Sequence, residues 1–232
     1  STFYNCNENG AIVKLEDTIH FHGILEIRPL INAVQINGYT IETGDSIQAS
    51  SISRADYFLN LTPVYNGPTY RVDVEKLVKE LEQLQPEIPD IKKFLQGFDL
   101  TKDVLVHLRQ SMPSAAIDMI NRYATRHVLQ SKPMIMKNSA NPSCEHFLDA
   151  KFFVNEENPR LNCFLVNEDW NRIDIKNDSK TVIVGGKNVG KSALAQYTIN
   201  RNIEKFQKIL LIDLDIGQQI CGIAQTVSAT VL

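Results

Sequence analysis

Residues 181–192 read TVIVGGKNVGKS, an apolar run followed by a glycine-rich segment. The last eight of these residues match G-x-x-x-x-G-K-[ST] at every defined position. The apolar run predicts a strand over Thr181–Val184, and the residues after the pattern predict a helix. Its expected buried stripe is Ala195, Ile199, Ile203 and Phe206. A glycine-rich turn that merely joins strand to helix is the simpler alternative, but it does not explain why Lys191 and Ser192 are both present.

Each defined position of this pattern has a chemical reason. Gly185 and Gly190 permit a tight turn, so that backbone N–H groups can converge on a phosphate. A helix that begins near Lys191 adds the positive end of its dipole. The Lys191 ammonium can reach the β- and γ-phosphates, and the Ser192 hydroxyl can ligate Mg²⁺. The sequence therefore predicts ATP binding by Gly185, Gly186, Lys187, Asn188, Val189, Gly190, Lys191 and Ser192.

A second apolar run, Ile209–Ile212, precedes two acids. It predicts a strand buried on both faces, which would complete a βαβ unit with a parallel sheet. Alternation along a strand puts Asp213 and Asp215 on one face, at the sheet edge where α/β proteins bind ligands. We expect Ser192, Asp213 and Asp215 to supply the Mg²⁺ site, with one carboxylate accepting a proton. In the alternative, one of the two acids is a solvated residue at the strand end.

The composition limits the class of protein. The chain has 232 residues, of which 43% are hydrophobic and 22% charged, with a net charge of −3. These values are typical of a globular protein and argue against a basic nucleic-acid coat. No apolar run approaches the roughly 20 residues that span a bilayer, so we expect no membrane partner. The cysteines are far apart and are expected as free thiols. The start at Ser1 and the stop at Leu232 within an apolar stretch suggest a fragment.

The amino-terminal part reads as β structure. Residues 11–62 predict about six short strands, with Asn37-Gly38 as a hairpin turn between two of them. Residues 63–71 read as a linker. Three helices are then predicted: one from Val74 with Asp73 as its cap and Pro86 as its stop, one over Leu100–Arg109, and one over Ser114–Leu129.

The predicted fold class is α/β: an amino-terminal β-sandwich-like domain, a helical middle, and the truncated start of a P-loop kinase parallel sheet. The corresponding domains are a β-rich domain over 1–62, a linker and helical region over 63–150, and the first part of a P-loop kinase domain over 151–232.

GGKNVGKS followed by DLDIGQ resembles the polynucleotide 5′-hydroxyl kinase family. Asp215 lies 24 residues after Lys191, which is similar to the spacing in that family. The GGKN form resembles the nucleolar, pre-rRNA-processing branch, a relative of the RNA kinase of the mRNA cleavage factor. The segments FHGILEI and AVQINGYTI are similar to the β domain that precedes the kinase in that branch.

The resemblance implies a transferase that is ATP- and Mg²⁺-dependent and moves a phosphoryl group to the 5′-hydroxyl of RNA or DNA. It implies Lys191 and Asp215 as catalytic residues, with Asp215 as proton acceptor, and Gln218 near the metal and phosphates. It further implies RNA 5′ ends in pre-rRNA as substrate, an endoribonuclease partner and a nuclear, nucleolar location. The lid would follow Leu232, so the present chain alone is expected to be inactive.

Two departures from the family pattern keep alternatives open. Residues 219–225 lack the Ser/Thr-Glu pair and prolines that are usual in the family, and Ala193 stands where a threonine is common. The chain could then be a different P-loop enzyme, such as a small-molecule kinase or an ATPase. It could also be a scaffold that retains a nucleotide loop without catalysis.

Overall fold

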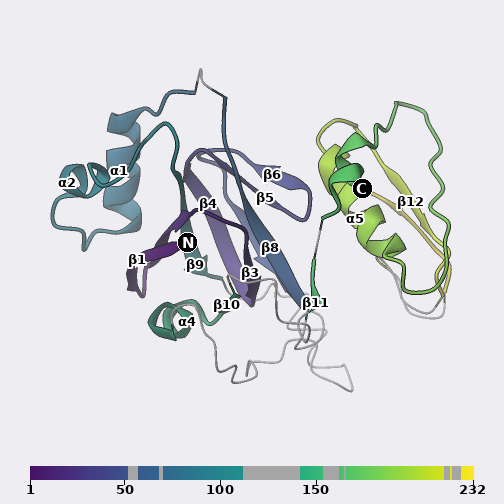
Figure 1. Cartoon of the computed structure of the whole chain (residues 1–232), viewed down its shortest axis with the longest axis horizontal. Coiled ribbons are helices and arrows are strands. Elements are labelled where there is room, and N and C mark those ends of the chain that lie inside the picture. The colour runs from purple at the N-terminus through teal and green to yellow at the C-terminus, as the bar shows by residue number, and fades with distance from the viewer. Residues whose placement is uncertain are drawn as a thin grey trace. The chain divides into compact units, whose positions relative to one another are not determined.

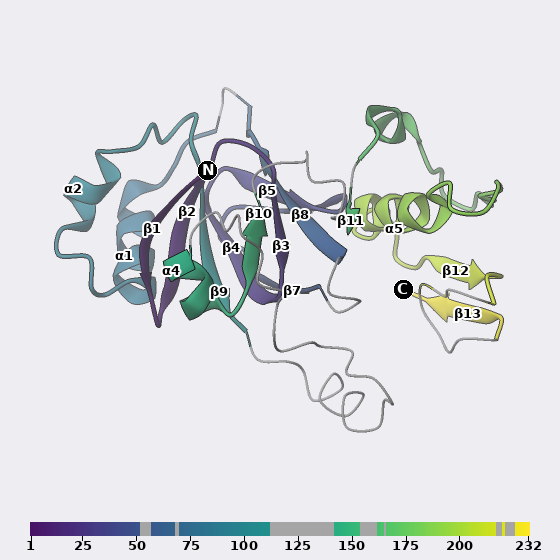
Figure 2. The same ribbon diagram turned by 60° about the horizontal axis from the view of Figure 1, so that its bottom comes forward.

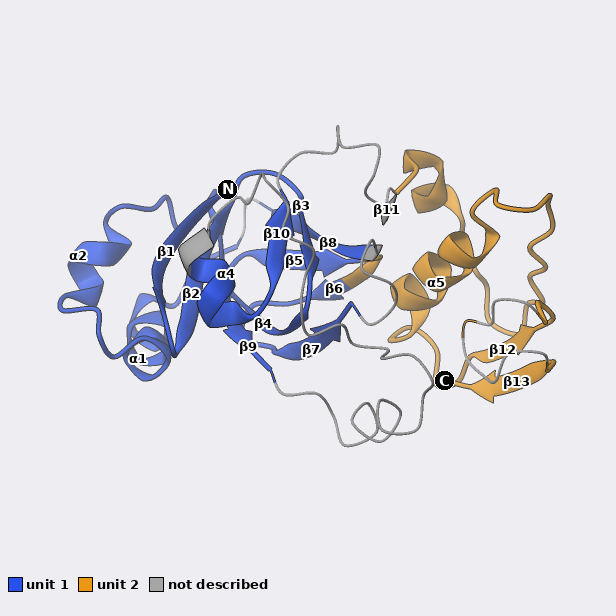
Figure 3. Cartoon of the chain, turned by 90° about the horizontal axis from the view of Figure 1, so that it is seen from below, with its two compact units in different colours: residues 1–36, 40–164 blue, residues 37–39, 165–232 orange. Residues whose placement is uncertain are grey.

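The computed structural model describes residues 1–51, 57–67, 70–111, 142–153, 162–164, 166–216, 220 and 226–232. The chain divides into two compact units (Figure 3): unit 1 comprises residues 1–36 and 40–164, and unit 2 comprises residues 37–39 and 165–232. The helix predicted over Ser114–Leu129 lies outside the described residues, as does Gln218. Among the described helices, none has the length and apolar character that crossing a bilayer requires.

Unit 1 is built mostly of strands (Figure 1). In chain order its elements are β1 (Thr2–Asn7), β2 (Gly10–Leu15), β3 (Ile19–His22), β4 (Ile24–Ile31), β5 (Ala33–Ile36), β6 (Tyr39–Ile41), β7 (Ile47–Ser50), β8 (Tyr57–Val64), α1 (Val74–Leu84), α2 (Ile91–Leu95), β9 (Val104–Gln110), α4 (Pro142–Leu148), β10 (Lys151–Phe153) and β11 (Asn162–Cys163).

Two sheets of antiparallel strands form the body of unit 1 (Figure 2). The described strands of one sheet run in the order β1-β2-β9-β4-β7, and those of the other run β10-β3-β8-β5-β6, with β11 pairing parallel to β8. The sheets pack against each other, since Phe3 on β1 meets Phe152 on β10 with ring centroids 5.1 Å apart. The β-rich fold predicted for the amino-terminal part is therefore confirmed.

The predicted hairpin turn is also confirmed. Asn37 and Gly38 join β5 to β6 with φ angles of 45° and 94°. Positive φ at both positions of a two-residue turn gives the backbone twist that matches the twist of paired strands, and Asn and Gly adopt it at the lowest cost.

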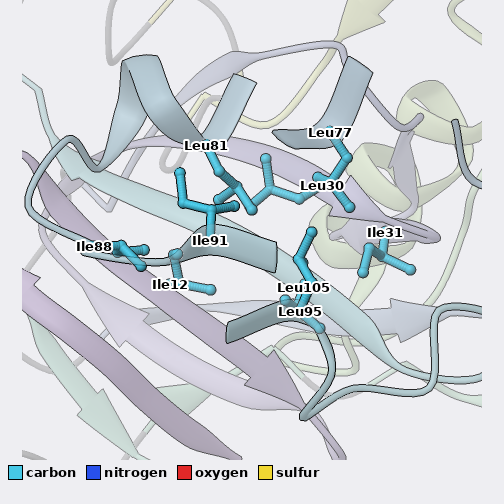
Figure 4. Close-up of a cluster of buried hydrophobic side chains, with 9 residues drawn as sticks. All are labelled: Ile12, Leu30, Ile31, Leu77, Leu81, Ile88, Ile91, Leu95 and Leu105. Carbon is cyan, nitrogen blue, oxygen red and sulfur yellow. The ribbon is translucent and has the colours of Figure 1, made fainter. Parts of the chain in front are cut away.

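Helix α1 begins where the sequence predicts. The Asp73 side chain accepts a hydrogen bond from the N–H of Lys76 at 3.0 Å, which satisfies one of the free donors of the first turn. The helix ends at Leu84, ahead of Pro86. Its buried face packs with α2 and the β1-to-β7 sheet in one apolar cluster (Figure 4), made of Ile12, Leu30, Ile31, Leu77, Leu81, Ile88, Ile91, Leu95 and Leu105.

The helix predicted over Leu100–Arg109 is wrong, because this segment contains the central strand β9. Strand β9 lies between β2 and β4, and each of its residues from Val104 to Leu108 is buried. A short apolar run that is buried on both faces has no periodicity that separates strand from helix. Segment 63–150 thus contributes a strand to the sheet of unit 1. The domain boundaries at 62 and 150 stay predictions.

The cysteine expectation is wrong for one pair. Cys6 on β1 and Cys144 on α4 form a disulfide with their Cα atoms 5.2 Å apart, although 138 residues separate them in the chain. Spacing along the sequence could not reveal this pair, because the two cysteines meet only when α4 folds against β1.

Unit 2 contains a short helix η1 (Glu168–Arg172), helix α5 (Lys191–Asn202), and strands β12 (Leu210–Asp213) and β13 (Ser228–Val231). Strands β12 and β13 pair antiparallel, and residues 181–184 form no regular strand. The expected parallel sheet is therefore not formed among the described residues. The predicted buried stripe on α5 is also wrong. The helix ends before Ile203, and its buried residues are Tyr197 and Asn202.

Candidate functional site

The glycine-rich loop leads directly into α5. Gly190 is the N-cap of this helix, with φ 87° and ψ 17°, and no side chain caps the first turn. The first helical bond runs from the N–H of Leu194 to the Gly190 carbonyl at 2.9 Å. Glycine is suited to this left-handed conformation because it has no Cβ. The N–H groups of the first turn therefore keep no side-chain acceptor and remain available to an anion.

The loop itself is exposed and tightly folded. Residues 185–190 all lie at the surface, and Asn188 takes a positive φ of 61°. A Cβ on Gly185 would stand 3.1 Å from Cγ2 of Val189, so the turn leaves little space for a side chain there. Gly186 and Lys187 lie in the same exposed turn. An open loop with a compact backbone is what close approach to a phosphate requires.

Lys191 folds back across this loop. Its Nζ donates a hydrogen bond to the carbonyl of Gly186 at 2.6 Å, while Ser192 beside it is exposed. The ammonium, the uncapped helix start and the exposed hydroxyl thus gather at one turn. This donor set fits a chain of phosphates, which carries negative charge and accepts hydrogen bonds.

The two acids have different surroundings. Asp213 is the last residue of β12 and is 7% exposed, whereas Asp215 follows the strand and is exposed. Asp213 is therefore not the solvated acid of the alternative, whereas Asp215 lies exposed just after the strand end. Oδ1 of Asp213 accepts from the N–H of Asp215 at 3.0 Å, and its Oδ2 accepts from the N–H of Ile220 at 2.7 Å.

Sequence reasoning missed this use of Asp213. The available signal was the spacing, because an aspartate commonly accepts from the N–H two residues ahead. Within the part of the chain that the structure describes, no group of three or more His, Cys, Asp or Glu side chains could hold a metal ion.

An exposed G-x-x-x-x-G-K-S loop at an uncapped helix start, following an antiparallel β domain, defines a P-loop nucleotide-binding chain. The comparisons with known proteins make this more specific. A family model described as "Polynucleotide 5'-hydroxyl-kinase NOL9, N-terminal domain" matches residues 1–153. A second model, described as "mRNA cleavage and polyadenylation factor CLP1 P-loop", matches residues 185–232. The chain belongs to the family of the NOL9 polynucleotide 5′-hydroxyl kinases, whose amino-terminal domain is cupin-like.

Two curated relatives carry the same family name. The chain is 26% identical over 237 residues to "Polynucleotide 5'-hydroxyl-kinase NOL9" of Drosophila melanogaster, covering 100% of this chain and 23% of that protein. It is 25% identical over 219 residues to "Polynucleotide 5'-hydroxyl-kinase nol9" of Dictyostelium discoideum, covering 89% and 31%. The resemblance found in the sequence is thus confirmed. The chain thus spans less than a third of the length of each of these relatives.

Proposed function

We propose that the protein is an ATP-dependent polynucleotide kinase, which transfers the γ-phosphoryl group of ATP to the 5′-hydroxyl of RNA. The observation that carries the proposal is the contact of Lys191 with Gly186, next to the uncapped start of α5. It supports a phosphate site in a chain whose family is named for this reaction. The relatives of the chain carry the name of the same activity.

ATP would lie with its phosphates along Gly185–Ser192. Backbone N–H groups of the loop and of the first turn of α5 would donate to the phosphate oxygens. Lys191 would exchange its hydrogen bond to Gly186 for a β- or γ-phosphate oxygen, because a charged acceptor binds an ammonium more strongly than a carbonyl does. Ser192 and Asp215 are exposed and could both contribute an oxygen to Mg²⁺. Bound Mg²⁺ would neutralise charge on the phosphates.

Asp215 would accept the proton of the attacking 5′-hydroxyl. The hydroxyl oxygen then forms a bond to the γ-phosphorus, the bond from that phosphorus to the β–γ bridging oxygen breaks, and ADP leaves. Lys191 would hold the γ-phosphoryl group in line with the hydroxyl and offset the charge that moves to the leaving oxygen. Gln218 would assist near the metal and phosphates.

The remainder of the kinase sheet is part of the proposal. Val182, Leu210 and Ile212 are exposed by more than half of their surface, although such side chains belong in a core. We expect residues 181–184 and β12 to become neighbouring parallel strands of a sheet whose faces are covered by helices. The length of the relatives supports this, since this chain covers 23% and 31% of them.

The finer biology rests on the resemblance to the nucleolar branch. We infer that the RNA is pre-rRNA, that the protein acts with an endoribonuclease, and that it works in the nucleolus. Co-purification of the full-length protein with an endoribonuclease and with pre-rRNA fragments would test these inferences.

A phosphoryl-transfer assay separates the candidate functions. Full-length protein is incubated with γ-labelled ATP and one RNA oligonucleotide, prepared with a 5′-hydroxyl or a 5′-phosphate. A 5′-kinase labels the first RNA and not the second. Release of inorganic phosphate at equal rates with and without RNA would instead indicate an ATPase. ATP binding without transfer or hydrolysis would indicate a scaffold.

A further inference from the structure

Asp213 is a buried carboxylate next to an exposed one. It ends β12 with 7% of its surface exposed, while Asp215 stands in solvent two residues later. Removing a carboxylate from water is costly unless hydrogen bonds replace the lost hydration. The hydrogen bonds that Asp213 accepts therefore indicate the role of its carboxylate in the fold.

Both oxygens of Asp213 accept hydrogen bonds from backbone on its carboxyl-terminal side. The N–H of Asp215 donates to Oδ1 at 3.0 Å, and the N–H of Ile220 donates to Oδ2 at 2.7 Å. The first contact is the turn in which an aspartate accepts from the residue two positions on. Bonds to an ionised acceptor are stronger than neutral ones. Asp213 thus holds the backbone at Asp215 and at Ile220 to the end of β12.

We propose that Asp213 is a positioning residue for Asp215, and that it is not a ligand of Mg²⁺. The hydrogen bond to Asp213 holds the backbone of Asp215 in place. It thereby restricts the position of the exposed Asp215 carboxylate, which would accept the proton. This inference deepens the proposed function and rests on it for the catalytic role of Asp215. It revises the sequence-based expectation that Asp213 joins Ser192 and Asp215 at the metal.

Variants of Asp213 in the full-length protein give graded expectations. In Asp213→Asn, the side-chain oxygen can still accept from the N–H of Asp215, but the NH₂ group that faces the N–H of Ile220 cannot accept a hydrogen bond. Asp213→Ala removes both hydrogen bonds. We expect kcat for 5′-phosphorylation to fall at least tenfold in Asp213→Ala and to stay within about threefold of wild type in Asp213→Asn. The Mg²⁺ concentration that gives half-maximal rate should shift by less than about twofold in both.

A metal-ligand role predicts a different pattern. Asp213→Asn would then lose as much kcat as Asp213→Ala, and extra Mg²⁺ or Mn²⁺ would restore part of the rate, because a neutral amide is a weaker ligand than a carboxylate. That result would overturn the inference. Asp215→Asn is the matched comparison, since it removes the neighbouring carboxylate and leaves the backbone bonds to Asp213 in place.

Amide hydrogen exchange without nucleotide tests the positioning role apart from activity. In Asp213→Ala, the amides of residues 215 and 220 should exchange about tenfold faster than in wild type. In Asp215→Asn, the amide of Ile220 should keep the wild-type exchange rate. Unchanged protection of the α5 amides confirms that unit 2, which carries the substitution, is folded in the variant. Unchanged exchange at both sites would overturn the inference even in an active kinase. If wild-type protein transfers no phosphoryl group, the proposed function fails, and the exchange rates still decide the role of Asp213.

Discussion

Strands β9 and β12 have similar residues and opposite surroundings. In β9, the side chains from Val104 to Leu108 are buried, whereas in β12 Leu210 is 60% and Ile212 56% exposed. Strand β9 lies between β2 and β4, while β12 pairs with β13 alone among the described strands. A strand-forming sequence thus produces a strand in both units, but only its neighbours decide whether its apolar side chains stabilise the fold.

The largest expected difference between the two strands is in stability. Leu108→Ala removes methyl groups from a fully buried site and should lower the free energy of unfolding by about 2–5 kcal/mol, because the cavity cannot be refilled without rearrangement. The matched change in β12, Ile212→Ala, should cost less than about 0.5 kcal/mol in this chain. Urea unfolding followed by circular dichroism measures both values. Equal losses would show that the contrast between the strands is wrong.

The second expected difference concerns pH and His107 on β9. Burial lowers the pKa of His107 to about 4. A hydrogen bond to the carbonyl of Asn9 favours the charged ring and opposes this shift, but the effect of burial is larger. The unfolded chain therefore binds more protons between about pH 6.5 and pH 4, and stability falls as the pH falls through this window. The loss should reach up to roughly 3 kcal/mol.

His107→Asn isolates this contribution from that of the carboxylates. The variant should be less stable than wild type at pH 7, since it loses packing, but its stability should decline less between pH 6.5 and pH 4. Chemical unfolding at several pH values gives both slopes. Parallel slopes would mean that His107 does not titrate differently in the folded protein.

The smallest effect distinguishes helices α1 and α5 by their first turns. Asp73 caps α1, whereas α5 starts at Gly190 without a side-chain cap. Asp73→Ala should therefore destabilise the protein by about 1 kcal/mol, and Asp73→Asn by less, because Asn keeps the accepting oxygen. Thermal unfolding of the two variants gives the comparison. A loss of similar size in both would assign the effect to charge rather than to the cap.

In unit 1, features set by neighbouring residues could be predicted from the sequence, and features set by distant residues could not. The Asn37-Gly38 turn and the Asp73 cap are local chemistry, and both were predicted correctly. Strand β9 and the pair Cys6–Cys144 depend on distant partners, so that no pattern along the chain could specify them.

At the candidate site, the loop and the start of its helix follow from the sequence of residues 185–192. Gly190 adopts the left-handed conformation that ends the loop, and α5 begins at Lys191. The different surroundings of Asp213 and Asp215 did not follow, since simple alternation assumes a strand that continues past Asp213. The strand ends there, and the backbone turns to donate hydrogen bonds to its own aspartate.

The most direct test of the account is phosphoryl transfer by the full-length protein and its Lys191→Ala variant, measured with a 5′-hydroxyl RNA beside their melting temperatures. The Lys191 ammonium donates a hydrogen bond to the carbonyl of Gly186 in an exposed loop, and its removal should leave the melting temperature unchanged within about 2 °C. The account predicts that transfer falls at least about 100-fold at this unchanged stability. Transfer that survives in the variant would contradict the assignment of the loop as the site of phosphoryl transfer.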